Sequence, residues 1–353
     1  IKMAEKMMGV VYHGVNDLRF EERDIPKIVE PRDAIVKVGL SSICTSDFHI
    51  RNGAVPRAKE NTILGHEFAG EVIAVGDLVQ KLKPGMRVAC NVETFCGECF
   101  FCKRGYVNNC IHGGWELGCR IDGCQTEYVR VPFADNGLTP IPDSLAYEDV
   151  IMISCILPSG YFGAELADIK PGDVVVVLGA GPVGYTSMIS ARLFGPAVIV
   201  ATDVIDERLA FAKKQGWADV TVNPQKEDLE KIVRSLSGGR GADAVIECAG
   251  GHNTFETAWQ IARPNGVVSL IAMYEEDQVL PLPKMYGKNL IFKTGGVDAS
   301  RNDILMRLIE GGKINTRPML THSMPLNDIM RGYEIFEKHL DGCIKVAITP
   351  YKR

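Results

Sequence analysis

The 353-residue sequence lacks several features that would place it in a specialised class of protein. It has no run of about eighteen apolar residues, which argues against a transmembrane helix. Lys and Arg number 39 against 44 Asp and Glu, and the net charge of -5 argues against a general binder of nucleic acid or anionic membranes. The first residues lack the apolar core and cleavage site of a secretory signal, so we expect a cytoplasmic protein.

The composition is that of an ordinary globular protein, with 46% hydrophobic and 24% charged residues and a length that suits two domains. Roughly the first 150 residues contain short β-branched runs separated by Gly, Pro, Asn and Asp. This alternation predicts a compact, barrel-like β-rich fold with long loops. The predicted strands lie at 9–13, 34–38, 70–75 and 86–90.

From Asp168 onward, apolar runs alternate with amphipathic ones. The continuous apolar run Val174–Leu178 is typical of a strand that is buried on both faces of a sheet. Helices are expected at 185–194 and 207–215, and the pattern as a whole predicts a doubly wound parallel sheet of six strands. The other five strands are expected at 197–202, 218–222, 244–248, 266–271 and 289–292. The chain then returns to mixed structure and ends with a short strand at 345–349.

Four of the eleven cysteines gather in one short loop, separated by two, two and seven residues. Thiolates at this spacing can close a tetrahedral shell around one zinc ion, and a reducing cytosol favours metal ligation over disulfides. Unrelated loop cysteines are the alternative. The predicted structural zinc ligands are Cys96, Cys99, Cys102 and Cys110. The other cysteines are expected to be small buried hydrophobes unless a partner is found.

A glycine-rich turn follows the apolar strand and opens the next predicted helix. Gly179 permits the tight turn, Gly181 lets a pyrophosphate approach the backbone, and Gly184 allows close packing of helix on strand. Asp203 ends the following strand, where a carboxylate binds the ribose hydroxyls and repels a 2′-phosphate. This favours NAD over NADP, although Arg208 lies near enough to complicate the choice. A glycine turn beside an unrelated surface acid is the alternative.

Two further segments carry potential ligands. Residues 44–49 contain a thiol, a hydroxyl, a carboxylate and an imidazole, and His66 is followed by Glu67. Taken alone, His66 is more often a core histidine than a metal ligand, and Cys155 in its apolar surroundings is most simply a core residue. Local spacing therefore leaves the chemistry of these residues open.

The order of these motifs resembles that of the zinc-containing medium-chain alcohol dehydrogenases over essentially the full chain, with likeness to bacterial secondary-alcohol dehydrogenases. The motifs that carry the resemblance are Cys44–His49, Gly65–Gly70, the four-cysteine loop, Cys155–Tyr161 and Gly179–Gly184. The resemblance implies an α/β protein with a GroES-like catalytic domain and a Rossmann-type domain. The expected bounds are 1–156 for the catalytic domain, 157–294 for the NAD-binding domain, and 295–353 for a segment that completes the catalytic domain.

The resemblance also implies a second, catalytic zinc held by Cys44, His66 and Cys155, with one position left open for the substrate. Glu67 would lie just behind this metal as a transient fourth ligand. Asp47 would orient His66 and fix its tautomer.

For the reaction, the resemblance implies that Ser46 takes up the alcohol proton and that His49 delivers it to solvent. Ser159 and Val183 would press against the nicotinamide, and Pro182 belongs to the same cofactor turn. For Ser46 and His49 the alternative is a loop-capping serine and a solvated histidine.

The expected protein is thus an NAD-dependent dehydrogenase with two zinc ions per chain that acts on a small primary or secondary alcohol, ketone or aldehyde. A homotetramer or dimer is expected by analogy. Cys155 stands where polyol-oxidising relatives tend to have glutamate, which favours simple alcohols. A polyol, diol or threonine dehydrogenase remains an alternative, as does a formaldehyde dehydrogenase, which the segment Gly113–Trp115 resembles. A non-catalytic, zinc-stabilised nucleotide-binding protein is the third alternative.

Overall fold

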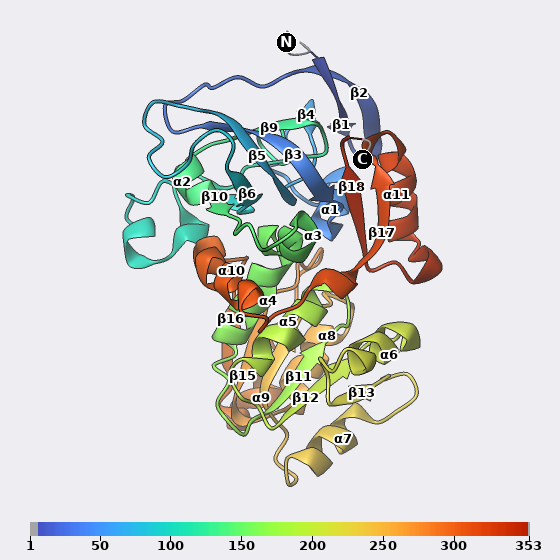
Figure 1. The fold of residues 1–353 in the computed structure, drawn as a ribbon. Helices are drawn as coiled ribbons and strands as arrows, with labels where there is room; N and C mark the ends of the chain where they lie inside the picture. Colours follow the sequence, from blue (N-terminus) through green and yellow to red (C-terminus); the bar gives the residue numbers. More distant parts are fainter. Residues whose placement is uncertain (1–5, 352–353) are drawn as a thin grey trace. The chain divides into compact units, whose positions relative to one another are not determined.

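The computed structural model describes residues 6–351 and divides into two compact units (Figure 1). The first unit comprises the described residues up to Pro158 together with those from Asp298 onward, and the second spans Ser159–Val297. The chain therefore leaves the first unit and returns to it.

The first unit is built from β-sheets whose interior positions carry aliphatic side chains. In β3, seven of nine side chains are buried, as expected for a strand at the centre of a sheet. The larger sheet has the order β10-β6-β5-β3-β18-β17, with β9 also paired to β3. Smaller sheets are β2-β1-β4 and β7-β8. The strands are β1 (Lys6–Gly14), β2 (Asp17–Asp24), β3 (Ala34–Ser42), β4 (Thr62–Ile63), β5 (Phe68–Val75), β6 (Arg87–Cys90), β7 (Glu93–Thr94), β8 (Gly114–Trp115), β9 (Tyr128–Val131), β10 (Leu138–Pro140), β17 (Leu320–Pro325) and β18 (Lys345–Thr349).

Short helices lie between the strands of this unit. Its α-helices are α1 (Thr45–Arg51), α2 (Ala134–Gly137), α3 (Tyr147–Val150), α10 (Asn302–Glu310) and α11 (Ile329–Glu337), while α4 (Ile156–Leu166) carries the chain into the second unit. Its 3-10 helices are η1 (Cys102–Arg104), η2 (Val107–Asn109), η3 (Ile151–Ser154), η5 (Ala299–Arg301), η6 (Arg317–Met319), η7 (Leu326–Asp328) and η8 (Leu340–Gly342).

The second unit is a six-stranded parallel sheet in the order β13-β12-β11-β14-β15-β16, which confirms the predicted doubly wound fold. All five residues of β11 are buried. The strands are β11 (Val174–Leu178), β12 (Val198–Thr202), β13 (Val220–Val222), β14 (Ala242–Glu247), β15 (Ala262–Leu270) and β16 (Ile291–Thr294). The helices are α5 (Pro182–Arg192), α6 (Asp206–Lys214), α7 (Leu229–Leu236), α8 (Thr254–Ile261), α9 (Leu282–Met285) and the 3-10 helix η4 (Tyr286–Lys288).

Two of the differences from the sequence-based expectation have a clear physical reason. Helix α5 begins at Pro182 rather than Tyr185, because proline is well suited to the first helical position, where no N–H is needed. Strand β2 was not predicted, since none of its side chains is fully buried and its sequence has no apolar run. Within residues 6–351, no single helix is long and apolar enough to cross a membrane; the bent pair 147–154 and 156–166 passes that test by length and composition when counted together.

Candidate active site

Four side chains from distant parts of the sequence converge inside the first unit. The potential ligand atoms of Cys44, His66, Glu67 and Cys155 all lie within 4.8 Å of one another. All four residues are buried, and His66 and Glu67 are each 1% exposed. The structure thus brings together the three predicted catalytic zinc ligands and the predicted transient fourth.

Helix α1 positions one side of this cluster. Cys44 is the N-cap residue of the helix, and its backbone N–H donates to Asp47 Oδ2 at 2.9 Å. Ser46 follows within the first turn, with Oγ 3.5 Å from Cys44 Sγ. His49 lies one turn further along, half-buried like Ser46. A single capped helix therefore presents a ligand, a hydroxyl and an imidazole in a fixed relation.

Asp47 is fully buried beside His66. Its Oδ1 lies 3.7 Å from His66 Nδ1, while its Oδ2 also accepts from Gln125 Nε2 at 2.9 Å. Gln125 in turn accepts from the Tyr333 hydroxyl at 2.7 Å. Burial raises the pKa of Asp47 to about 7, against the opposing charge of His66. The Gln125–Tyr333 pair thus fixes the carboxylate that faces the imidazole.

The donor set fits a zinc ion. Neither ring nitrogen of His66 has a hydrogen-bond partner of normal geometry within residues 6–351, and neither does Glu67 Oε1. Buried polar atoms of this kind are normally satisfied, and here they converge with two thiols. A hydrogen bond from Cys155 holds the pKa of Cys44 well below its usual range. Burial alone would lower the pKa of His66, but the nearby charges of Cys44, Asp47 and Glu67 raise it to about 9.

A buried lysine supports Glu67 from behind. Lys345, on β18, donates to Glu67 Oε2. It also donates to the Ile43 carbonyl oxygen, at a distance of 2.7 Å. The Ser42 hydroxyl donates to the same Oε2 atom. One carboxylate oxygen is therefore tied to the sheet while the other faces the cluster.

Sequence reasoning missed these supporting residues: Ser42, Gln125, Tyr333 and Lys345. A charged residue inside the last apolar strand was the one available signal for Lys345. Trp115 packs edge-on against His66, with ring centroids 5.3 Å apart. Phe48 instead packs in the core against Tyr333. Tyr274, in the second unit, donates to Glu247 Oε2 at 2.5 Å.

The four-cysteine loop forms a second cluster. Its sulfur atoms all lie within 4.8 Å of one another, with Cys96 Sγ and Cys102 Sγ 4.0 Å apart. Backbone N–H groups point at the sulfurs: that of Cys96 donates to Cys110 Sγ at 3.3 Å, and those of Cys102 and Ile111 hold the pKa of Cys99 at about 6. These N–H contacts favour the thiolate, which is the form that binds zinc, whereas burial raises the pKa of Cys102 to about 12 and also raises the pKa of Cys110.

The glycine-rich turn lies between β11 and α5. Gly179 has a φ of +98°, and a Cβ on Gly184 would lie 1.8 Å from the Gly179 carbonyl oxygen. Gly181 is the N-cap of α5, and a Cβ there would meet nothing closer than Arg208 Nη1 at 4.0 Å. The backbone around Gly181 is therefore open to a ligand at a helix N-terminus. Pro182, Val183 and Ser159, at the starts of α5 and α4, are each partly exposed.

Asp203 lies at the end of β12, beside this turn. Its Oδ2 accepts from the Ala180 N–H at 2.8 Å, and its Oδ1 accepts from the Ile205 N–H at 2.9 Å. Arg208 Nη1 lies 3.8 Å from Asp203 Oδ2. The Asp203 carboxylate is thus fixed by a hydrogen bond from the glycine-rich turn.

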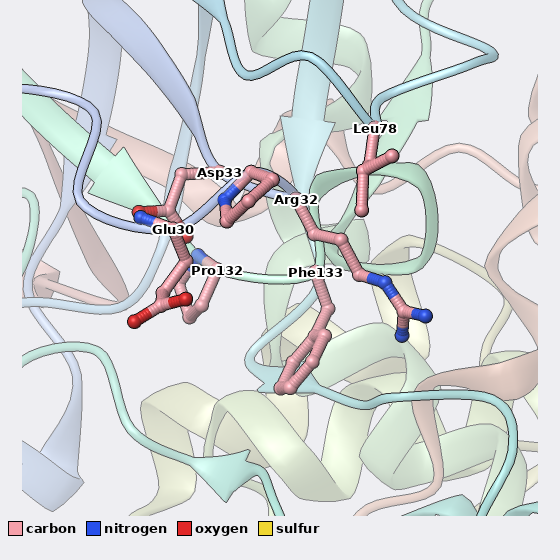
Figure 2. A pocket seen from close by; sticks show the side chains of 7 residues that line it. Glu30, Arg32, Asp33, Leu78, Pro132 and Phe133 are labelled. Atoms are coloured by element: carbon pink, nitrogen blue, oxygen red, sulfur yellow. The ribbon is translucent and has the colours of Figure 1, made fainter.

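A pocket in the first unit contains none of the predicted site residues. Figure 2 shows Arg32, Leu78 and Phe133 among the side chains that line it. Arg32 forms a 3.1 Å ion pair with Glu98 of the four-cysteine loop. Asp33 Oδ2 accepts hydrogen bonds from the Val29 and Glu30 N–H groups. These polar groups hold the surrounding loops together, so the pocket is not a candidate for the catalytic centre.

Comparison with known proteins assigns families to both units. Residues 30–143 match the alcohol dehydrogenase GroES-like domain, and residues 182–304 match the zinc-binding dehydrogenase domain. The chain is 35% identical to an alcohol dehydrogenase of Cupriavidus necator, over 99% of this chain and all of that protein. It is 33% identical to the NADP-dependent isopropanol dehydrogenase of Thermoanaerobacter brockii, over 94% of each protein. The solved structure of zinc-dependent alcohol dehydrogenase 2 from Streptococcus pneumonia, an apo form, has a TM-score of 0.92 at 34% identity and covers 98% of this chain and 99% of that one.

Proposed function

Because the chain belongs to the zinc-containing medium-chain dehydrogenase/reductase family, we propose that it oxidises a small primary or secondary alcohol reversibly with NAD. The observation that carries this proposal is the buried convergence of Cys44, His66 and Cys155. A thiolate–imidazole–thiolate set leaves an open zinc position, whereas the four-cysteine cluster is closed and suits a structural ion. We propose that residues 1–156 and 295–353 form the catalytic domain and that residues 157–294 form the cofactor-binding domain.

In the proposed reaction, zinc supplies a Lewis acid that favours loss of the alcohol proton, and the nicotinamide accepts the hydride. Cys44, His66 and Cys155 would hold the metal, and Glu67 would be a transient fourth ligand. Asp47 would fix the orientation of His66. Ser46 would take up the proton and His49 would pass it to solvent, so that the alcohol loses one hydride and one proton in all.

For the cofactor, Gly179, Gly181 and Gly184 would admit the pyrophosphate at the N-terminus of α5. Pro182 and Val183 in α5 and Ser159 in α4 would contact the nicotinamide. Asp203 would bind the ribose hydroxyls, with Arg208 beside it.

A substrate panel tests the proposal. Zinc-loaded enzyme with NAD is expected to oxidise 2-butanol, 2,3-butanediol or both, with turnover that stops when the metal is chelated. Activity restricted to sorbitol, threonine or formaldehyde would assign one of the alternative substrates. No activity on any alcohol or aldehyde would favour a non-catalytic nucleotide-binding protein.

Asp203 tests the choice of cofactor. Asp203→Gly is expected to lower the ratio of kcat/KM for NAD to that for NADP by about tenfold or more, because the carboxylate that repels the 2′-phosphate is gone. Asp206→Asn, which removes a neighbouring exposed carboxylate that pairs with Lys226, is the matched control. Native enzyme that prefers NADP, as the isopropanol dehydrogenase does by its name, would contradict the choice of NAD.

His49 tests the proton relay. His49→Gln is expected to slow alcohol oxidation near neutral pH and to flatten the pH–rate profile, because the imidazole no longer carries the proton to solvent. His322→Gln, on the partly exposed strand β17, should leave the profile as it is. An unchanged profile in His49→Gln would remove the residue from the relay.

The proposed homo-oligomer, a tetramer or dimer, has a candidate contact in the second unit. Strand β16 ends the six-stranded sheet, so one of its edges is unpaired within the described chain. Exposed apolar side chains lie on or near it: Leu282, Tyr286 and Ile291. Exposed edges with apolar side chains invite pairing with a second copy. Light scattering on the purified protein gives the stoichiometry, and a monomer would contradict the proposal.

A further inference from the structure

One acidic side chain lies close to the catalytic cluster and has no role in the mechanism above. Glu93 on β7 is directly opposite Trp115 on β8 in an antiparallel pair. Residues directly opposite each other in such a pair project from the same face, with Cβ atoms about 5 Å apart. Since the Trp115 ring packs against His66, Glu93 is separated from a metal ligand by a single side chain.

The carboxyl group of Glu93 is buried and incompletely bonded. The residue is 6% exposed, and its Oε2 has no hydrogen-bond partner in the part of the chain that the structure describes. Burial raises the pKa of Glu93 to about 8, and the negative charge of Asp298 adds to this effect. The Ala299 N–H and the Arg57 charge oppose it. At neutral pH the group is therefore mostly a neutral acid, which can both donate and accept a hydrogen bond.

The neighbouring charged groups are already engaged. Asp298 accepts from the Ser300 N–H at 2.8 Å and is itself 7% exposed. The guanidinium of Arg57 lies over the Trp115 ring, 5.3 Å from its centre. Among these groups, Glu93 is the one whose side chain has an oxygen without a hydrogen-bond partner in the described residues, and it is linked to His66 through Trp115. Leaving such an atom unpaired beside an apolar substrate chain would cost binding energy, whereas a polar group on the substrate would satisfy it.

We propose that Glu93 is a specificity-determining residue that hydrogen-bonds a second hydroxyl group of the substrate, so that diols and their hydroxyketones are preferred over monoalcohols. This inference rests on the proposed alcohol dehydrogenase function and narrows its substrate class. It also reverses the preference for simple alcohols that Cys155 suggested from sequence.

The test compares 2,3-butanediol with 2-butanol, which has the same carbon chain and lacks one hydroxyl group. Native zinc-loaded enzyme is expected to show a kcat/KM for the diol about tenfold or more above that for 2-butanol. Glu93→Leu is expected to lower this ratio by about tenfold, chiefly through a higher KM for the diol, with 2-butanol oxidised as well as before or better. Glu93→Gln, which keeps a donor and an acceptor, should retain most of the preference.

Thr94→Val is the matched control, because Thr94 is buried on the same strand and projects from its opposite face. It should leave the ratio unchanged. An unchanged ratio in Glu93→Leu would overturn the inference, and so would native enzyme with no preference for the diol, a result that needs no variant to fold. Preference for 3-amino-2-butanol over the diol would overturn it in favour of a cation-binding role. Native enzyme that oxidises none of the three would instead overturn the proposed function, and the inference with it.

Discussion

Cys155→Ala is expected to reduce alcohol oxidation by about a thousandfold or more and to lower the zinc content from two ions per chain to one. A Lewis acid at this position contributes several kcal/mol to stabilising developing negative charge, and each ~1.4 kcal/mol corresponds to a factor of ten in rate. Cys155 is one of two thiols among the buried donors, so its loss leaves His66 and Cys44 with an incomplete set. Native mass spectrometry counts the ions, and steady-state kinetics on 2-butanol and 2,3-butanediol gives the rate.

Cys90→Ala is the matched control for this change. Cys90 is a fully buried cysteine in the same unit, but it lies outside both candidate metal clusters and donates to the Asn91 carbonyl oxygen. It should keep two zinc ions and nearly normal activity. If Cys155→Ala retained two ions and full activity, the catalytic cluster would have to be assigned elsewhere.

Cys99→Ser is expected to remove the other zinc ion and to lower the Tm by about 10 °C, with the catalytic zinc retained. The four-cysteine loop has two short 3-10 helices for regular structure, and its small apolar cluster consists largely of the cysteines themselves. The metal therefore takes the place of a hydrophobic core in this loop. Structural zinc sites contribute folding free energy of many kcal/mol, and each kcal/mol moves the Tm of a large domain by about 2–4 °C.

Calorimetry together with a zinc count checks this prediction. Glu98→Gln provides the control, because it removes the exposed ion pair with Arg32 from the same loop and leaves the thiols in place. Exposed pairs contribute about 0–1 kcal/mol, so its Tm should change little. Loss of the ion from Cys99→Ser with no change in Tm would contradict a structural role for the loop.

Much of the fold could be predicted because its signals are local. The parallel strands of the second unit are apolar runs such as Val174–Leu178, and the glycine turn follows one of them directly. The spacing of the four cysteines alone predicts that they form a cluster. Strand β2 escaped prediction because its side chains are partly exposed on both faces, so neither alternation nor a continuous run appears.

The catalytic cluster is a different case. Cys44, His66 and Cys155 lie in three separate segments, and the residues themselves left their role open until the motif order was compared with a known family. Their supports, including Gln125 and Lys345, could not be predicted, since a hydrogen-bond partner is decided by tertiary packing rather than by neighbours in sequence. Glu93 gave no signal either, because one acid in a short strand is usually solvated, and its burial emerges from the β7–β8 pairing.

The pairing of β18 with β3 also bears on how the protein is made (Figure 1). Cys44 follows β3 directly, whereas Lys345, which ties down Glu67, stands on β18 near the end of the described chain. During synthesis the ribosome delivers Cys44, His66, Cys155 and the whole second unit before residue 345 emerges. The second unit can therefore form while translation continues, but the carboxylate behind the catalytic cluster gains its lysine only after the whole second unit has been translated.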